Sequence, residues 1–402
     1  MSSLSTSCVS APRPDRATPA EFVFLYVAGL LFGTKLANVL LVGPSATTGI
    51  TGAIETPAMQ LVWLGLYAIV GLLVALRYRT SLFLLTRSPL IVFLILLTVL
   101  SALWSLEPQT SLRRGMAVIG SSLYAVYIVG RLPFRSIVLL LAAIFGTFVL
   151  LSLFVCLFMP EIGIMQPGSG WPGYWQGMKY HKNALGRASA VAAVILFLAS
   201  TTVRGRARWF CYVSIAVAVL LVIVSRSTTA LIVLASTAAL GVFAAIYQRS
   251  VTASLLTIAT GVLGVVTFSV AILLSGGVAA LFDLFGKDPT LTGRLPMWDL
   301  VFNAIQQKFW LGWGYSAFWR ETAMHVREIA AGLQYTPEYS HNGLLETWLH
   351  VGVFGVALFV AVWTIALIKA IVFARAYRDH LIALFPLLYI YSFGLSNFTA
   401  GR

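Results

Sequence analysis

Long apolar segments recur along the whole chain, and they restrict its fold more than any other feature. Eleven runs of mostly apolar residues alternate with shorter polar segments, and a transmembrane helix needs about 20 such residues. Because lipid offers no hydrogen bonds to the backbone, each run must be helical. The sequence therefore predicts an all-α, polytopic integral membrane protein, with about 11–12 transmembrane helices in a single domain over residues 1–402. We place the spans at residues 21–42, 58–76, 88–104, 115–130, 136–159, 183–201, 208–224, 227–246, 253–275, 342–370 and 381–398.

The composition excludes several classes of protein. Charged residues make up 10% of the chain, whereas soluble globular proteins carry about 25%, so an ordinary soluble enzyme is excluded. The 27 Lys and Arg outnumber the 13 Asp and Glu, but they are scattered between apolar runs instead of forming the basic patch of a nucleic-acid binder. The three cysteines have no zinc spacing, and the sequence has no P-loop or dinucleotide fingerprint. We therefore predict no metal site, no cofactor and no nucleic-acid partner.

The distribution of arginine predicts the orientation of the spans. If the N-terminus lies in the cytoplasm, 13 arginines fall in the short inside connections, whereas the short outside connections hold Arg113, Arg114 and Arg226. This asymmetry follows the positive-inside rule. We predict a cytoplasmic tail over residues 1–20, followed by a first span that is retained because no small-residue cleavage site interrupts it.

Two outside connections, at about 160–182 and 276–341, are much longer than the others. Loops of this length in a compact fold usually have a function or are disordered. The second contains apolar residues at helical spacing, which predicts an amphipathic helix on the membrane surface. These residues are Trp298, Val301, Phe302, Ile305 and Phe309. Tryptophans such as Trp298 suit stacking against sugar rings and equally suit the aromatic belt at headgroup level.

A histidine and an asparagine directly precede the tenth span. Near a helix N-terminus the imidazole of His341 stays neutral and can accept a proton, which suits a general base, but the position also suits a helix cap. Glu346, one turn past His341, is placed to orient the imidazole or to pair with an arginine. Beyond Asn342, the glycines at 352 and 355 are one turn apart and predict close approach of another helix or a lipid chain.

Several outside cations lie where the positive-inside rule disfavours them. Arg226 lies in a tight turn between two spans, and Arg294 lies just before the predicted surface helix. A guanidinium group binds two oxygens of a diphosphate at once, although an arginine that snorkels to lipid headgroups explains each position as well. Two further pairs, His181 with Lys182 and Arg113 with Arg114, are candidates for phosphate binding or for interfacial positions, and we rank the first pair higher.

These residues resemble the signature of a known family. His341 and Asn342, followed after nine residues by Gly352 and Gly355, resemble the O-antigen ligase and polymerase superfamily, the Wzy-C group of bacterial envelope proteins. The large outer loop matches that family's usual run through Gly293, Arg294, Trp298 and the stretch 311–314. The trio His181, Lys182 and Asn183 with Gly186, and the group Trp104, Ser105 and Pro108, resemble the ExoQ-type exopolysaccharide polymerases.

The resemblance implies a function. Members of the family take a glycan from undecaprenyl diphosphate and transfer it to a hydroxyl of a growing glycan acceptor, without a metal and with inversion at the anomeric carbon. They act in the bacterial inner membrane with the active site facing the periplasm, which makes 276–341 a periplasmic loop. The family's essential histidine corresponds to His341, and its two essential arginines correspond to Arg226 and Arg294. His181, Lys182, Asn342, Trp298, Arg113, Arg114 and Glu346 are then candidates for substrate binding.

Two other functions remain open at this point. A ligase that moves a finished chain to lipid A core needs the same donor and the same base as a polymerase, so the sequence separates the two poorly. A transporter for lipid-linked sugar is the rival from another class, and it requires polar or broken helices at the bilayer midplane. Lys35, inside the first span, is the main residue that fits the transporter. A chain-length regulator is a further candidate partner.

Overall fold

The computed structural model describes residues 17–43, 56–167, 171–249, 294–319, 326–327, 330, 337 and 339–400. Within these ranges the chain is mainly helical, and one isolated bridge, between Ile164 and Trp175, is its β pairing. The all-α, multi-pass prediction is confirmed. The helices are α1 (Pro19–Gly33), α2 (Leu36–Val42), α3 (Pro57–Leu76), α4 (Tyr78–Thr86), α5 (Pro89–Leu100), η2 (Ser101–Leu103), α6 (Pro108–Arg131), α7 (Phe134–Phe158), α8 (Pro160–Gly163), α9 (Lys182–Ser200), α10 (Gly205–Val224), α11 (Thr228–Arg249), α14 (Arg294–Gln307), α16 (Gly343–Ala376), η3 (Leu381–Leu384) and α17 (Phe385–Ala400).

Ten of the eleven predicted spans coincide with described helices, and the ninth, at 253–275, lies outside the described residues. Six single helices of the described chain are long and apolar enough to cross a membrane, and up to eight spans result if each of two bent pairs counts as one. Of the predicted total of about 11–12 spans, the described part of the chain therefore supports six to eight. α6 does not meet the same criteria, because its first turns carry Arg113 and Arg114 among other polar residues.

Both bent pairs differ from a simple span. α1 and α2 meet at 83°, with Lys35 buried between them at 1% exposure. The Lys35 ammonium donates to the carbonyl oxygen of Ile162 at 2.6 Å, and its backbone N–H donates to that of Met178. The loop 160–182 therefore packs into the break. A bend of 95° separates α4 from α5, so the expected inside connection at 77–87 contains a helix of its own.

The tenth predicted span, α16, is interrupted in its first half. Its 34 residues would extend about 50 Å if straight, well beyond the roughly 30 Å of the hydrocarbon core. Val351 and Gly352 have non-helical backbone angles, with φ +70° at Gly352. A Cβ at Gly352 would overlap the carbonyl of Trp310. The prediction that Gly352 and Gly355 share a regular helical face is therefore wrong, because the backbone of the outer loop, not another helix or a lipid chain, approaches Gly352.

The interruption frees carbonyl oxygens of α16 for the outer loop. The backbone N–H groups of Trp313 and Gly314 donate to the carbonyl oxygens of Leu349 and His350 at 2.7 and 3.1 Å. A continuous helix would have used these acceptors internally. The loop segment 309–319 is thus anchored to the break in α16.

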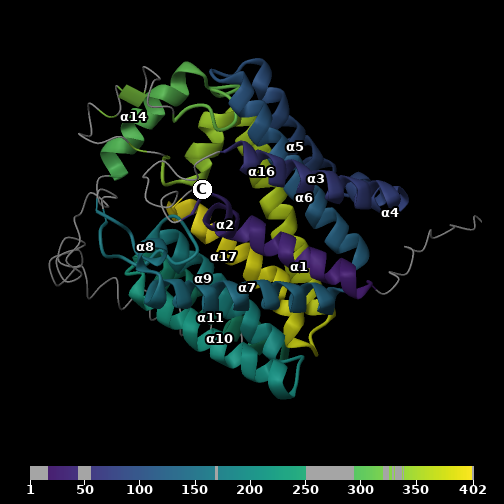
Figure 1. Ribbon diagram of the computed structural model, residues 1–402. Helices are drawn as coiled ribbons and strands as arrows, with labels where there is room; N and C mark the ends of the chain where they lie inside the picture. The colour runs from purple at the N-terminus through teal and green to yellow at the C-terminus, as the bar shows by residue number, and fades with distance from the viewer. Residues whose placement is uncertain are drawn as a thin grey trace, which may run out of the picture.

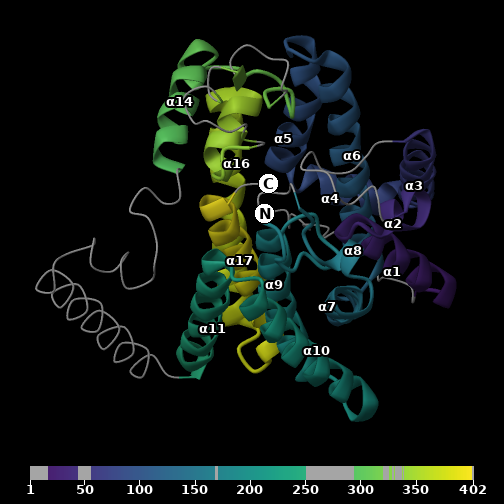
Figure 2. The same cartoon turned by 60° about the vertical axis from the view of Figure 1, so that its left-hand side comes forward.

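The predicted amphipathic helix exists as α14, but its apolar face packs against protein. Val301 and Ile305 are buried against a cluster that includes Leu345 and Leu349 of α16, whereas Phe302 is exposed. α14 lies beside the first part of α16 in both views (Figure 1 and Figure 2). The stripe that the sequence assigns to the membrane surface therefore serves mainly to hold α14 on α16.

α9 lies at the centre of the lower helices and packs against α7, α10, α11 and α17 (Figure 2). Its buried residues include Ser189, Ala190, Ala192 and Ala193, and such small side chains let helices approach closely. α17 runs antiparallel to α16, with Trp363 of α16 donating from Nε1 to the carbonyl oxygen of Ile390. Close packing of α9 fixes the positions of its neighbours' ends.

Connections that the predicted orientation assigns to the inside meet at one end of the bundle. Arg131 makes a two-point ion pair with Glu21, at 2.7 and 3.0 Å, and Arg135 donates to the carbonyl oxygen of Thr202. Phe134 makes an edge contact with Phe373 near the end of α16. This grouping agrees with the predicted topology, while the side that faces the cytoplasm stays a prediction.

Candidate active site

His341 lies immediately before α16, but it does not cap that helix. Asn342 is the N-cap, and its side-chain oxygen accepts from the backbone N–H groups of Leu344 and Leu345 at 3.0 and 3.4 Å. The capping interpretation of His341 is therefore wrong. The His341 ring centroid lies 4.1 Å from that of Tyr339. His341 lies at the N-terminus of α16, where the sequence places it.

The backbone of His341 is in the left-handed region, with φ +55°, which costs a non-glycine residue about 1–2 kcal/mol. Its neighbour Ser340 is held from both sides. The Ser340 N–H donates to Glu346 at 2.9 Å, and the Ser340 carbonyl accepts from the indole N–H of Trp298 at 2.8 Å. The Ser340 hydroxyl donates to the carbonyl oxygen of Asn342 at 2.8 Å. These contacts fix the chain on either side of His341.

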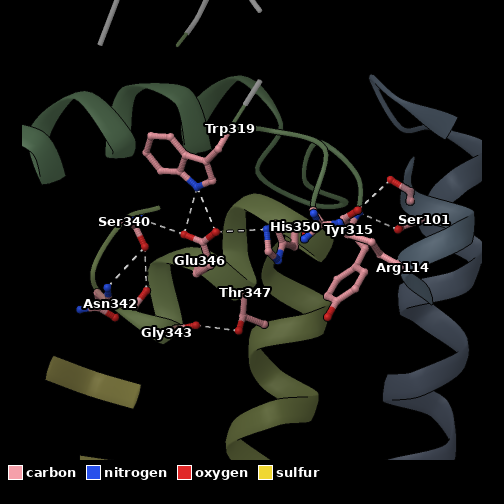
Figure 3. A network of polar contacts seen from close by, with 12 residues as sticks. Ser101, Arg114, Tyr315, Trp319, Ser340, Asn342, Gly343, Glu346, Thr347 and His350 are labelled. Atoms are coloured by element: carbon pink, nitrogen blue, oxygen red, sulfur yellow. Dashed lines mark hydrogen bonds and ion pairs between the residues drawn. The ribbon is translucent and has the colours of Figure 1, made fainter. Parts of the chain in front are cut away.

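Glu346 accepts hydrogen bonds from groups other than the predicted ones. Its carboxylate accepts from the indole N–H of Trp319 at 2.9 and 3.1 Å and from the Ser340 N–H, and its Oε1 lies 3.2 Å from Nε2 of His350 (Figure 3). The prediction that Glu346 orients the His341 imidazole directly or pairs with an arginine is therefore replaced by this network. His350 was missed, although its place four residues after Glu346 puts the two on one helical face.

The same network extends to η2, directly after α5, and to α6. The Tyr315 ring lies 5.2 Å from that of His350, and the Tyr315 backbone accepts from the Ser111 hydroxyl and donates to the Ser101 hydroxyl, both at 2.9 Å. Arg114 donates to the Ser316 hydroxyl at 3.3 Å. Of the predicted pair, Arg114 thus lies at the edge of the His350 network, and Arg113 is exposed on the same turns of α6.

The second group of predicted residues lies at the start of α9. His181 is the N-cap of α9, and its Nδ1 accepts from the Asn183 N–H at 3.1 Å. Burial, together with Lys182 and Arg187, lowers the pKa of His181 to about 4. The imidazole is therefore neutral at physiological pH and acts here as a hydrogen-bond acceptor, so the positive charge of this group belongs to its neighbours.

A tyrosine joins two of the predicted cations. The Lys182 ammonium lies 3.9 Å from the ring centroids of both Trp171 and Tyr174. The guanidinium carbon of Arg226 lies 5.7 Å from the centroid of the same Tyr174. Each contact is a cation–π interaction, in which the electron-rich ring face attracts the cation. The loop 160–182 thus brings Lys182 and Arg226 together, a contact that sequence spacing does not reveal.

The backbone supports this arrangement. Arg226 has φ +49° in the turn between α10 and α11, and the Ser227 hydroxyl accepts from the Ala230 N–H at 3.4 Å. Gly186 of α9 lies against this turn, since a Cβ there would be 2.5 Å from the Ser225 hydroxyl and 2.8 Å from the Ala230 Cβ. The first turn of α9 and the Arg226 turn are therefore in direct contact.

The end of α17 connects the two groups. Leu395 packs with Val222 and Ala230 beside the Arg226 turn. Two residues later, Asn397 lies so close to Gly343 that a Cβ there would overlap the Asn397 amide. The N-termini of α9, α11 and α16 thus lie at one end of the bundle, and the positive ends of their dipoles favour an anion there.

Arg294 is described by its backbone alone. It begins α14, one helical turn before Trp298, which contacts Ser340. The structure thus groups Arg226 and Lys182 in a cation cluster next to the neutral His181. Ser340, Asn342, Trp298 and Glu346 form a hydrogen-bonded cluster on either side of His341. Residues that the sequence did not single out as site residues include Tyr174, Tyr315, Trp319, Ser340 and His350.

Comparisons with known proteins agree with the motifs. Residues 213–360 match the family model described as O-antigen ligase, a segment that contains Arg226, Arg294 and His341. A stretch of 102 residues, 23% of this chain, is 29% identical to the exopolysaccharide production protein ExoQ of Rhizobium meliloti (strain 1021), and it covers 22% of that protein. The chain thus matches about a fifth of the length of this relative. The two matches confirm the similarity of the chain to the O-antigen ligase superfamily and its ExoQ-like branch.

Proposed function

We propose that the protein is a membrane glycosyltransferase that polymerises undecaprenyl-diphosphate-linked oligosaccharide repeats into a surface polysaccharide. The observation that carries the proposal is the position of the Arg226 and Lys182 cluster at the same end of the helix bundle as His341. One group suits a diphosphate and the other a base. The similarity to an O-antigen ligase family and to an exopolysaccharide production protein supports the same reaction.

In the proposed reaction, the oxygen of an acceptor hydroxyl attacks the anomeric carbon of the donor glycan. The bond from that carbon to the diphosphate oxygen breaks, so the anomeric configuration inverts and undecaprenyl diphosphate leaves with both bonding electrons. His341 takes the hydroxyl proton. Arg226 and Arg294 hold the diphosphate and balance the charge that grows on it, so the proposed reaction requires no metal ion.

We propose that the other candidate residues either position the site or contact the substrate. Lys182 adds positive charge beside Arg226 and, through its ring contacts, holds the loop 160–182 in place. His181, Asn342, Trp298 and Glu346 make the helix caps and hydrogen bonds described above, so we assign them to positioning the site. Arg113 and Arg114, at the start of α6, are proposed to meet the phosphate or glycan at the rim. The site is proposed to face the periplasm from the bacterial inner membrane.

A lipid-linked sugar transporter is the second candidate function, favoured by the broken pair α1 and α2. A break with a buried lysine is the kind of feature that transporters use near the midplane. Here, however, Lys35 bonds to the loop 160–182 and is 1% exposed. This contact supports a structural role for the break, which anchors the loop 160–182.

An O-antigen ligase is the third candidate function, and it differs from the polymerase in the acceptor alone.

Purified protein in liposomes with lipid-linked repeats tests the proposal. The wild type should lengthen the glycans, and His341→Ala should lower the rate by about 10²- to 10⁴-fold, the usual contribution of a general base. The control is His380→Ala, an exposed histidine beyond the other end of α16, which should leave the rate unchanged. Normal lengthening by His341→Ala contradicts the proposal, and translocation without lengthening favours the transporter.

Glycans from a deletion strain distinguish polymerase from ligase. A strain without the polymerase should accumulate single repeats, whereas a strain without a ligase should retain long chains on the lipid carrier. We expect single repeats. Long carrier-linked chains would reassign the acceptor to lipid A core, while the roles of His341 and Arg226 would stay as proposed.

A further inference from the structure

A buried carboxylate lies beside the proposed base, and the reaction above gives it no chemical step. Glu346 is 9% exposed, and an ionised carboxylate at such a position is unfavourable unless hydrogen-bond donors surround it. Three donors do so, the Trp319 indole, the His350 imidazole and the Ser340 N–H. The first two come from the outer loop and from α16, and the third belongs to the segment that carries His341 (Figure 3).

The contact with Ser340 constrains His341 through the backbone. Glu346 holds the N–H of Ser340, and Trp298 holds its carbonyl group, so both peptide groups of Ser340 have fixed directions. On the other side, Asn342 is fixed by its cap on α16. With both neighbours fixed, the chain closes through His341 in the left-handed conformation observed there. Such a conformation persists only where the surroundings impose it.

We propose that Glu346 is a positioning residue for His341, acting through the Ser340 amide, with His350 and Trp319 keeping the carboxylate in place. The inference rests on the proposed function in one respect, that His341 is the base. Loss of the Glu346 contact frees the Ser340 peptide, so the imidazole moves from its reactive position. A displacement of about 1 Å in a reacting group costs about 10²-fold in rate.

The outer loop also contributes to the contacts that hold Glu346 in place. Trp319 belongs to the loop, and His350 lies next to the break in α16, where its carbonyl accepts from Gly314 and its ring packs on Tyr315. Docking of the segment 309–319 on α16 therefore supplies Trp319 to Glu346 and holds His350 in place beside it. In this way the large outer loop acts on the orientation of the base and not only on the shape of the site.

Kinetics of three variants in liposomes test the inference. Glu346→Ala should lower kcat by about 30- to 100-fold while KM for the lipid-linked donor changes by less than about 3-fold, because orientation of the base is lost and donor binding is not. Glu346→Gln keeps an oxygen for the Ser340 N–H and should recover at least about 10-fold of that loss. The matched control is Thr347→Val, which removes only an intrahelical hydrogen bond to Gly343 and should keep the wild-type kcat.

A double variant separates positioning from general damage. If Glu346 acts through His341, Glu346→Ala should add no loss to the residual rate of His341→Ala, because residues that act as a unit are not additive. The inference would be overturned if Glu346→Ala lowered the rate by the same factor in the wild type and in His341→Ala. It would also be overturned if Glu346→Ala changed KM alone. A third contrary result would be a Glu346→Gln variant that is as inactive as Glu346→Ala while its melting temperature is unchanged. A fully active His341→Ala would instead refute the proposed function.

Discussion

The two halves of the candidate site are built by different means. Around Arg226, cation–π contacts with aromatic rings hold the cations near helix N-termini. Around His341, directed hydrogen bonds to Ser340, Glu346 and Asn342 fix the backbone. An anion is attracted by charge over a range of geometries, whereas a base works only within hydrogen-bond reach of one proton. The comparison teaches that directed hydrogen bonds are concentrated around the residue to which we assign the proton transfer.

After His341→Ala, the largest effect is expected from removal of the Arg226 guanidinium group. Arg226→Ala should lower kcat/KM by about 10²- to 10³-fold, because a preorganised group that balances the leaving charge is removed. Arg226→Lys should retain part of the activity, since it keeps the charge but not the two-point contact. Initial rates of glycan lengthening measure both. The exposed Arg206, in the predicted inside connection, provides the control Arg206→Ala, and equal losses in Arg226→Ala and Arg206→Ala would contradict the role.

The next effect concerns the anchoring of the outer loop. Gly352→Ala requires an unfavourable φ and overlaps the Trp310 carbonyl, so the loop should separate from α16 and kcat should fall by about 10-fold or more through the base. Gly71→Ala, a helical glycine of α3 with open space around its Cβ position, is the control and should be neutral or stabilising. The melting temperature in detergent and the kcat report both changes. A wild-type kcat in Gly352→Ala would show that the loop does not act on the base.

A smaller effect is expected when the shared ring is removed. Tyr174→Leu loses the cation–π contacts that position Lys182 and Arg226. If misplacement of the cations costs donor binding the energy of one such contact, about 0.5–2 kcal/mol, the donor should bind about 2- to 30-fold more weakly with little change in kcat. Tyr212→Leu, at an exposed position of α10, is the matched control. KM for the lipid-linked donor is the measurement. A fall in kcat without a change in KM would place Tyr174 in the positioning half instead.

The smallest effect is a pH dependence of stability. The pKa of His181 is lowered to about 4 in the folded protein, below the ordinary value near 6.5, so between these values the unfolded chain binds more protons. Stability should therefore fall as the pH drops from about 6.5 to about 4 and change little from this group above that range. His181→Asn keeps a capping side chain and should reduce the slope. Melting temperatures across this range measure it, and identical slopes would exclude His181 as the cause.

The sequence predicts the parts of the molecule that depend on local patterns. Apolar length predicts α3, α7, α9, α10 and α11, because a membrane-spanning segment satisfies its backbone groups internally. The start of the tenth apolar run also predicts that His341 and Asn342 directly precede a helix, which is α16. The helix α4 and its bend against α5 are not visible in this pattern, because α4 lies in the arginine-bearing segment 77–87, which the pattern assigns to a connection.

Contacts between distant segments are the part that local patterns do not encode. Glu346 was expected to act within its own turn, but its partners Trp319 and Ser340 depend on how the outer loop packs. Gly352 was assigned to a helical face, and only the approach of the Trp310 backbone explains it. Tyr174 joins Lys182 to Arg226 across more than 40 positions of the chain, which spacing alone does not indicate.

The last turns of α17 contain the two contacts that set the distance between the halves of the site. Leu395 lies against the helices that present Arg226, and Asn397 lies against the start of α16. This helix therefore lies as a spacer between the proposed diphosphate site at Arg226 and the proposed base, although neither Leu395 nor Asn397 has a proposed chemical role. One residue inserted between them would rotate one contact by about 100° relative to the other, and so uncouple two intact half-sites.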